Sequence, residues 1–282
     1  MGIENTNLYN ELVKRKSEYV VNIDKVYVKA KEFLPKINRV FANYTGHGME
    51  HSLNVMKYMF DLINDINMLS DLEIACLIYS ALLHDVGMVV SEKEIKEIRE
   101  DKLICNGRKY SAIHEYIQDD LECIQECVRP IHGIRSYDFI MENMNAELFL
   151  VPGYTACSFQ EEVAEICQAH TMELEYTVKR LKSKDIKGEN RLNAQYVVML
   201  LRIADYLDID EKRAPMEVYK FIAPSGYGDD EWKQHYIISN KNKIESSVAN
   251  RKKIILYGQC KNPKIHNKFL RYLDDVAREI GW

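Results

Sequence analysis

Apolar residues recur every three to four positions along most of the first 210 residues, which is the spacing of amphipathic helices. This pattern predicts helices at 8–34, 49–63, 91–101, 111–144 (broken at Pro130) and 160–170. Two further helices are apolar on nearly every side and should be buried, at 71–83 and 193–207. Glycine, proline and polar residues predict loops at 44–48, 105–110, 151–154 and 183–190.

The pattern changes after Pro215, where short stretches of β-branched and aromatic residues alternate with turn residues. Strands are predicted at 216–222, 236–239, 244–248 and 253–259, with a loop at 224–228 and a final helix from Pro263 to Trp282. That last helix ends without a polar tail, as expected of the leading part of a longer protein.

The predicted fold is therefore mainly α, a helical bundle with a small C-terminal α+β appendage. Three segments are expected: an N-terminal helical segment at 1–40, a helical domain at 41–210 and the appendage at 211–282.

Composition narrows the function more than the fold. The formal net charge of -5 disfavours a dedicated duplex-DNA binder, which usually carries a basic surface. The seven cysteines are odd in number and scattered, and no secretory segment precedes them, so we expect reduced thiols in a cytoplasmic protein. No apolar stretch is long enough to span a membrane.

The candidate chemistry lies in polar residues that interrupt the apolar helices. His84 and Asp85 end the buried helix at 71–83, and Asp205 lies inside the apolar run at 193–207. His51, His132 and His170 lie at the ends or in the first turns of other helices.

Each of these residues also has a purely structural explanation. Asp205 could pair with Arg202 on the same helix, and a lone histidine commonly finds an ordinary partner in the core. Taken together, however, imidazoles and carboxylates converging from separate helices suit manganese, iron, cobalt, nickel, zinc or magnesium. Two such ions about 3.5–4 Å apart would activate a bridging water for attack on a phosphate.

The order of these residues resembles the HD superfamily of metal-dependent phosphohydrolases, over roughly Phe41 to Pro215. The segments that carry the resemblance are 48–52 (GMEHS), 81–87 (ALLHDVG) and 201–208 (LRIADYLD), followed by Arg213-Ala214-Pro215. The resemblance implies an all-α domain that hydrolyses nucleotides, cyclic nucleotides, cyclic dinucleotides or nucleic acid.

The resemblance also implies a ligand set. The first ion would be held by His51, His84, Asp85 and Asp205. His132 and His170 resemble the extra histidines of two-metal branches, in which Asp85 bridges the two ions. The appendage resembles HD modules beside Hsp90-like ATPase domains in bacterial conflict systems, which would make an attached ATPase domain or a second copy of the chain a partner.

One departure concerns the phosphate contact. Many members carry a lysine shortly after the His-Asp pair, where this chain has Met88. The cations that could replace it are Arg129, Arg135, Arg108 and Lys109. His114 could donate a proton to the leaving group, so Asp85, His114 and Arg135 are the predicted catalytic residues.

The favoured hypothesis is a phosphohydrolase or phosphodiesterase that acts on a nucleotide-like small molecule through a metal-activated hydroxide. The alternatives are a catalytically weak, nucleotide-sensing regulatory module and a single-strand nuclease. A helical domain with purely structural histidines would bind no metal.

Overall fold

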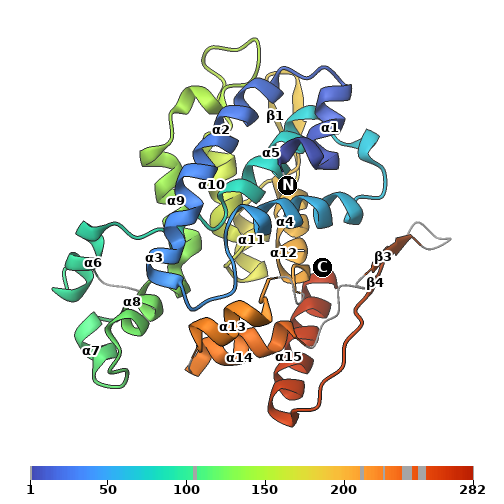
Figure 1. The fold of residues 1–282 in the computed structure, drawn as a ribbon. Coiled ribbons are helices and arrows are strands. Elements are labelled where there is room, and N and C mark those ends of the chain that lie inside the picture. Colours follow the sequence, from blue (N-terminus) through green and yellow to red (C-terminus); the bar gives the residue numbers. More distant parts are fainter. Residues whose placement is uncertain are drawn as a thin grey trace.

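The computed structural model describes residues 2–103, 107–209, 213–224, 226–236, 243–246 and 252–281. The helices over these residues are α1 (Asn7–Lys14), α2 (Tyr19–Phe33), α3 (Asn38–Phe41), α4 (Met49–Leu62), α5 (Asp71–Leu83), α6 (Glu92–Arg99), α7 (Tyr110–His114), α8 (Asp120–Val128), α9 (His132–Asn143), α10 (Gln160–Ala169), α11 (Leu174–Arg180), α12 (Ala194–Leu207), α13 (Met216–Ile222), α14 (Gly226–His235) and α15 (Pro263–Ile280). Two antiparallel hairpins pair β1 (Asp185–Lys187) with β2 (Asn190–Leu192) and β3 (Lys243–Ser246) with β4 (Lys252–Ile255). The prediction of a mainly helical bundle with a small α+β portion is confirmed (Figure 1).

Helix α5 lies in the centre of the bundle, with α2, α4, α10 and α12 packed around it (Figure 1). Ser70 fixes its start through a capping box with Glu73, and every residue of the helix after Asp71 is buried. The apolar residues 72–83 therefore bury their side chains on all sides of the helix, as the sequence predicts.

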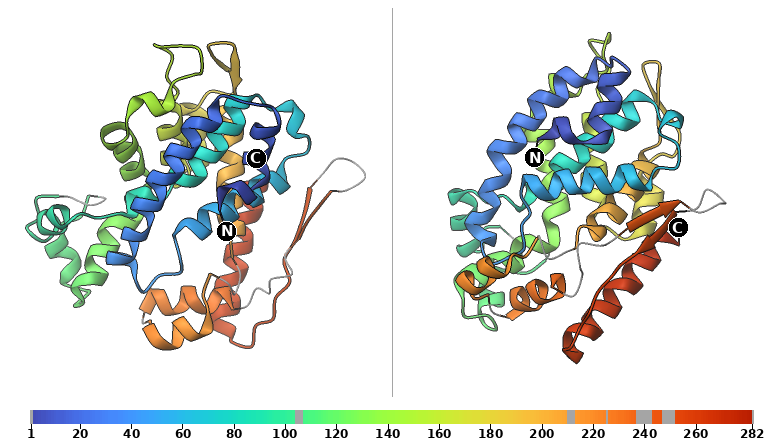
Figure 2. Two further views of the ribbon diagram at one scale, coloured as in Figure 1. Left: turned by 45° about the horizontal axis from the view of Figure 1, so that its top comes forward. Right: turned by 45° about the vertical axis from the view of Figure 1, so that its right-hand side comes forward.

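The C-terminal helices pack against one end of this bundle (Figure 2). Helix α15 contacts α12, and α14 contacts α15. A buried ion pair joins the first two helices, with Arg202 Nε 2.7 Å from Glu279 Oε2. The alternative in which Arg202 pairs with Asp205 is therefore not realised, because its guanidinium points to α15 instead.

The strand predicted at 216–222 is also wrong, because this segment forms helix α13. The segment buries none of its side chains, and Phe221 is 91% exposed. A strand there would need a neighbouring strand to satisfy its backbone, whereas a helix satisfies its own. The predicted loop at 224–228 is likewise overridden where α14 begins at Gly226.

The remaining differences are local. The loop predicted at 183–190 contains most of the β1–β2 hairpin, and the helix predicted at 111–144 is also interrupted between α7 and α8. Strands β3 and β4 confirm part of the strands predicted at 244–248 and 253–259. Residues 237–239 of the strand predicted at 236–239 lie outside the described residues, and Tyr236 forms a turn.

The cysteines in the described part of the chain are all free, as expected from their scattered positions. Within the same ranges no single helix has both the length and the apolarity to cross a membrane, although the bent pair Asp71–Met88 and Glu92–Arg99 passes that test by length and composition.

Candidate metal centre

The His-Asp pair lies where the central helix ends. His84 is the C-terminal cap of α5, and Asp85 precedes a 3-10 turn at Val86–Met88. Both side chains are almost completely buried, at 0% and 4% exposed. Burying a carboxylate beside imidazoles is stable only if charges are paired within the cluster.

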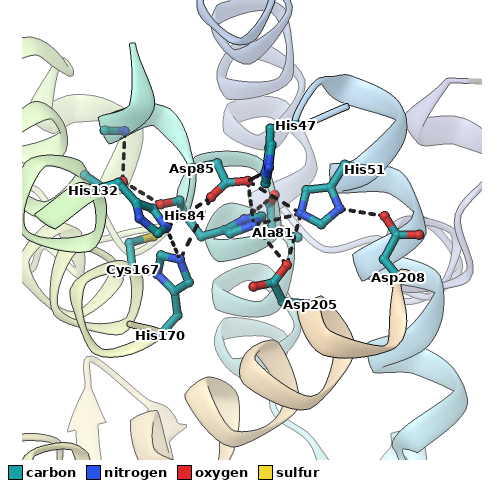
Figure 3. Close-up of polar contacts among 12 residues, drawn as sticks. His47, His51, Ala81, His84, Asp85, His132, Cys167, His170, Asp205 and Asp208 are labelled. Carbon is teal, nitrogen blue, oxygen red and sulfur yellow. Dashed lines mark hydrogen bonds and ion pairs between the residues drawn. The ribbon is translucent and has the colours of Figure 1, made fainter. Parts of the chain in front are cut away.

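The first cluster joins three helices around one point (Figure 3). His51 Nε2 of α4 lies 3.2 Å from His84 Nε2 and 3.1 Å from Asp205 Oδ1 of α12. Asp85 Oδ2 lies 3.5 Å from His51 Nε2 and 3.3 Å from His84 Nε2. The four residues predicted for a first ion thus lie together.

The second cluster shares Asp85 with the first. Its other oxygen, Oδ1, lies 3.5 Å from His132 Nε2 and 3.9 Å from His170 Nε2. The two imidazole nitrogens are 3.0 Å apart. Asp85 therefore directs one oxygen to each cluster, which is the arrangement of a bridging carboxylate (Figure 3).

All four imidazoles make a hydrogen bond at Nδ1, three of them to a backbone carbonyl. His84 Nδ1–H donates to Ala81 O at 3.1 Å, and His132 Nδ1–H donates to Arg129 O at 2.7 Å. His170 makes the equivalent bond to the carbonyl of the residue three positions earlier. These bonds fix the protonated nitrogen, so that each Nε2 presents a lone pair to the cluster.

His51 is oriented by a carboxylate instead of a carbonyl. Asp208 Oδ2 accepts from His51 Nδ1 at 2.6 Å, and its Oδ1 accepts from Asn54 Nδ2 at 3.0 Å. Sequence reasoning missed this role of Asp208. Its position three residues after Asp205, at the C-terminal cap of α12, was the available signal.

The electrostatics follow from this packing. Burial alone would lower the pKa of His84, but the adjacent Asp85 and Asp205 raise it to about 9. Burial would raise the pKa of Asp85, but His84 and His47 hold it well below its usual range. Burial, together with the neighbouring His132 and His84, lowers the pKa of His170 to about 3.

This geometry fits a divalent metal. The Nε2 atoms of His51 and His84 are 3.2 Å apart, and those of His132 and His170 are 3.0 Å apart. Lone pairs on nitrogens this close repel unless a proton or a cation lies between them. The donors are nitrogen and oxygen atoms, which suit borderline and hard divalent ions. Three groups of donors could each hold an ion: His47, His51 and Asp85; His51, His84 and Asp205; and Asp85, His132 and His170.

His47 also lies at this centre, a position that sequence reasoning did not assign to it. Its Nδ1–H donates to Asp85 Oδ2 at 2.9 Å. Burial lowers the pKa of His47. The signal in the sequence was its place in the glycine-containing loop just before the helix that carries His51.

The two other predicted catalytic residues lie elsewhere. His114 stacks on Tyr110, and its Nδ1 lies 3.5 Å from Cys123 Sγ, with no described contact to the six predicted ligands. Arg135 donates to the carbonyl oxygens of Gly87 and Val89, at 2.7 and 2.8 Å. Arg135 therefore supports the turn that follows the His-Asp pair.

Three cavities lie near these residues. One, of about 250 Å³, opens onto the centre and is lined among others by His47, His132 and Asp205. Arg129, Arg213 and Met88 line it too. A cavity of about 460 Å³ reaches a single predicted ligand, His51, and one of about 960 Å³ behind the turn at 86–90 reaches none. The first is the better substrate site because it reaches ligands of both clusters.

The chain was compared with protein families, curated proteins and solved structures. No curated protein and no solved structure gives a significant match. The family model HD-CE matches residues 41–281. The match spans the predicted helical domain at 41–210 and nearly all of the predicted appendage at 211–282. It does not divide the two, so the domain boundary near residue 210 stays a prediction. An HD-type family and clusters of His and Asp able to hold a metal together support a metal-dependent hydrolase in general. Because the match covers most of its length, the chain belongs to the HD-CE family, an HD-type domain.

Proposed function

We propose that the chain is a metal-dependent phosphohydrolase or phosphodiesterase that acts on a nucleotide, a cyclic nucleotide or a related small phosphate ester. The observation that carries this proposal is the position of Asp85, which directs one carboxylate oxygen to each of two clusters. Divalent ions bound there would supply Lewis acidity to a phosphate and lower the pKa of a water molecule.

The residues of the chain have separate tasks in this proposal. His51, His84 and Asp205 would hold one ion, and His132 and His170 the other, with Asp85 shared. The turn after Asp85 is held by Ser136, whose hydroxyl donates to His84 O at 2.5 Å and accepts from Gly87 N at 2.9 Å.

Phosphate charge also needs cations outside the metal clusters. Arg129 and Arg213 line the cavity at the centre. They could supply the positive charge that many members take from a lysine at the position of Met88. His47 lines the same cavity and contacts Asp85, so it is better placed than His114 to exchange a proton with a substrate.

The first test is the metal content of the purified protein by elemental mass spectrometry, beside the His84→Ala/Asp85→Ala double variant. About two ions per chain are expected, and the double variant should lose them. His114→Ala is the control, because its side chain has no described contact with the clusters, and it should keep the metal.

A nucleotide screen with manganese, cobalt and nickel then measures turnover. Release of product that depends on His84 and Asp85 supports the hydrolase. Stoichiometric binding of nucleotide without product would favour the sensor module that the missing lysine makes plausible. A wild-type protein that takes up none of these ions would end both proposals.

A further inference from the structure

The wall opposite the metal clusters comes from the C-terminal helices. The cavity of about 250 Å³ is bounded on one side by ligands and their neighbours, among them Asp205 and His132. On the other side it is bounded by Gln234 and His235 of α14 and by Tyr272 of α15. The residues that bind metal and the residues that enclose the substrate space thus come from distant parts of the chain.

These helices are anchored to the bundle next to the cavity. Trp232 of α14 is 2% exposed, and its indole Nε1–H donates to Asn43 O at 2.7 Å. The hydroxyl of Tyr272 donates to the carbonyl oxygen of Tyr206, the residue after Asp205. Both anchors fix the wall relative to the metal ligands.

One polar side chain in this wall has no hydrogen-bond partner among the described residues. Gln234 is 4% exposed as a residue, yet its amide atoms are not among the side-chain atoms that are fully buried without a partner, so they face the cavity. An amide offers two donors and one acceptor, and polar groups of largely buried residues are nearly always paired. An amide on a largely buried residue that faces a cavity without a partner from the described chain points to a partner that enters the cavity.

We propose that Gln234 is a specificity-determining residue that hydrogen-bonds the base of a substrate of single-nucleotide size; this inference rests on the proposed function. A carboxamide presents a donor and an acceptor side by side, which matches the hydrogen-bonding edge of a nucleobase. Tyrosines 44, 206 and 272 add aromatic surface to the same cavity, and Arg129 and Arg213 add positive charge for a phosphate.

The size of the cavity favours a single nucleotide over a polynucleotide. Its volume of about 250 Å³ lies just below the range for drug-sized ligand sites, roughly 300–1,000 Å³. A strand of nucleic acid needs a groove with room for several successive bases. The wall formed by α14 and α15 borders the space beside the metal ligands and limits its size instead.

A structural role for Gln234 makes the opposite prediction for stability. If its amide supported the fold, replacing it by methionine, which has a similar length, would destabilise the protein. If its partner is a ligand, Gln234→Met removes no hydrogen bond within the described fold, and the melting temperature should stay the same or rise.

The test compares binding of the four ribonucleoside 5′-monophosphates with binding of ribose 5-phosphate by titration calorimetry, using manganese-loaded protein. We expect the wild type to bind at least one nucleotide about tenfold more tightly than ribose 5-phosphate. Gln234→Met should remove this preference, leave the affinity for ribose 5-phosphate and the metal content unchanged, and not lower the melting temperature. Gln118→Met is the matched control, since Gln118 is exposed and lies outside this cavity.

The outcomes separate this inference from the proposed function. A wild type without base preference, or a variant that keeps it, overturns the role of Gln234 even if the protein hydrolyses phosphate esters. A preference that depends on Gln234 in a protein without turnover supports the role of Gln234 and contradicts the hydrolase. If Gln234→Met lowers both the base preference and the melting temperature, the proposed role of Gln234 is also contradicted, because the amide then supports the fold.

Discussion

Asp208 offers the sharpest test of how this centre is organised, because it lies outside the ligand set and yet fixes one ligand. Its carboxylate is buried and accepts a hydrogen bond from His51 Nδ1–H at 2.6 Å. Burial would raise the pKa of Asp208, but the hydrogen bond from His51 and the charge of Arg213 lower it, so it is an anion at neutral pH. The Asp208→Asn substitution keeps the shape of the side chain and removes the charge.

The expected loss can be worked from the role of the carboxylate. An anion at this position accepts from Nδ1, which leaves the Nε2 lone pair of His51 toward Asp205 and His84. An asparagine can rotate and donate from its NH₂ group, which favours the wrong tautomer of His51. Removing such an outer partner typically costs 10–100-fold in metal affinity, which corresponds to about 1.4–2.8 kcal/mol.

The assay is competition for manganese or cobalt between the protein and a chelator of known affinity. Asp61→Asn is the matched control, because Asp61 lies near the end of α4 and its ion pair within the described part of the chain is with Lys57, at 3.2 Å. The control should keep wild-type affinity. If Asp208→Asn also keeps it within about twofold, the tautomer of His51 is not set by Asp208 and the reasoning fails.

Three further predictions address pH, backbone packing and the C-terminal helix. Because the pKa of His84 is raised to about 9, a metal must displace its proton at neutral pH, so apparent metal affinity should rise about tenfold per pH unit from pH 7 to 9; a flat profile by calorimetry would contradict this. Protonated His84 should also stabilise the metal-free protein, because its pKa is higher in the folded than in the unfolded state. This stability is fully present below the unfolded pKa of about 6.5 and is lost as the pH rises through about 9. Gly87→Ala places a Cβ against the His132 carbonyl oxygen and should destabilise the protein by about 1–3 kcal/mol in urea unfolding, whereas Gly46→Ala meets open space and should not. Glu279→Ala leaves Arg202 buried without its carboxylate and should cost about 3–5 kcal/mol in the same assay; a change below about 1 kcal/mol would show that α15 is not an integral part of the fold.

Most of the helical core could be predicted because its sequence signals are local. Helix α5 has a Ser70 cap, a glutamate three residues later and an uninterrupted apolar run, so its limits and its burial follow from short-range rules. Segment 216–222 has no such signals. Its alternation of apolar and polar residues fits a strand as well as a helix, and only the absence of a neighbouring strand in the described fold decides for α13.

The candidate site divides in the same way. The six predicted ligands could be found because imidazoles and carboxylates stand out against apolar helices. Asp208 and His47 could not be ranked above other polar residues, since their roles depend on distances to His51 and Asp85 that only the fold determines. The partner of Arg202 stayed open for the same reason, because it lies 77 residues away on α15.

That last contact bears on how chemistry and selectivity are distributed along the chain. Arg202 is one turn before Asp205 on α12, and it holds the carbonyl oxygen of Ala169, next to His170, while it pairs with Glu279. The helix that closes the cavity is therefore bonded to the helices that carry a ligand of each cluster. A shift of α15 would disturb both of these helices. We therefore expect the metal centre and the cavity wall formed by α14 and α15 to be ordered together, although the wall follows all the metal ligands in the sequence.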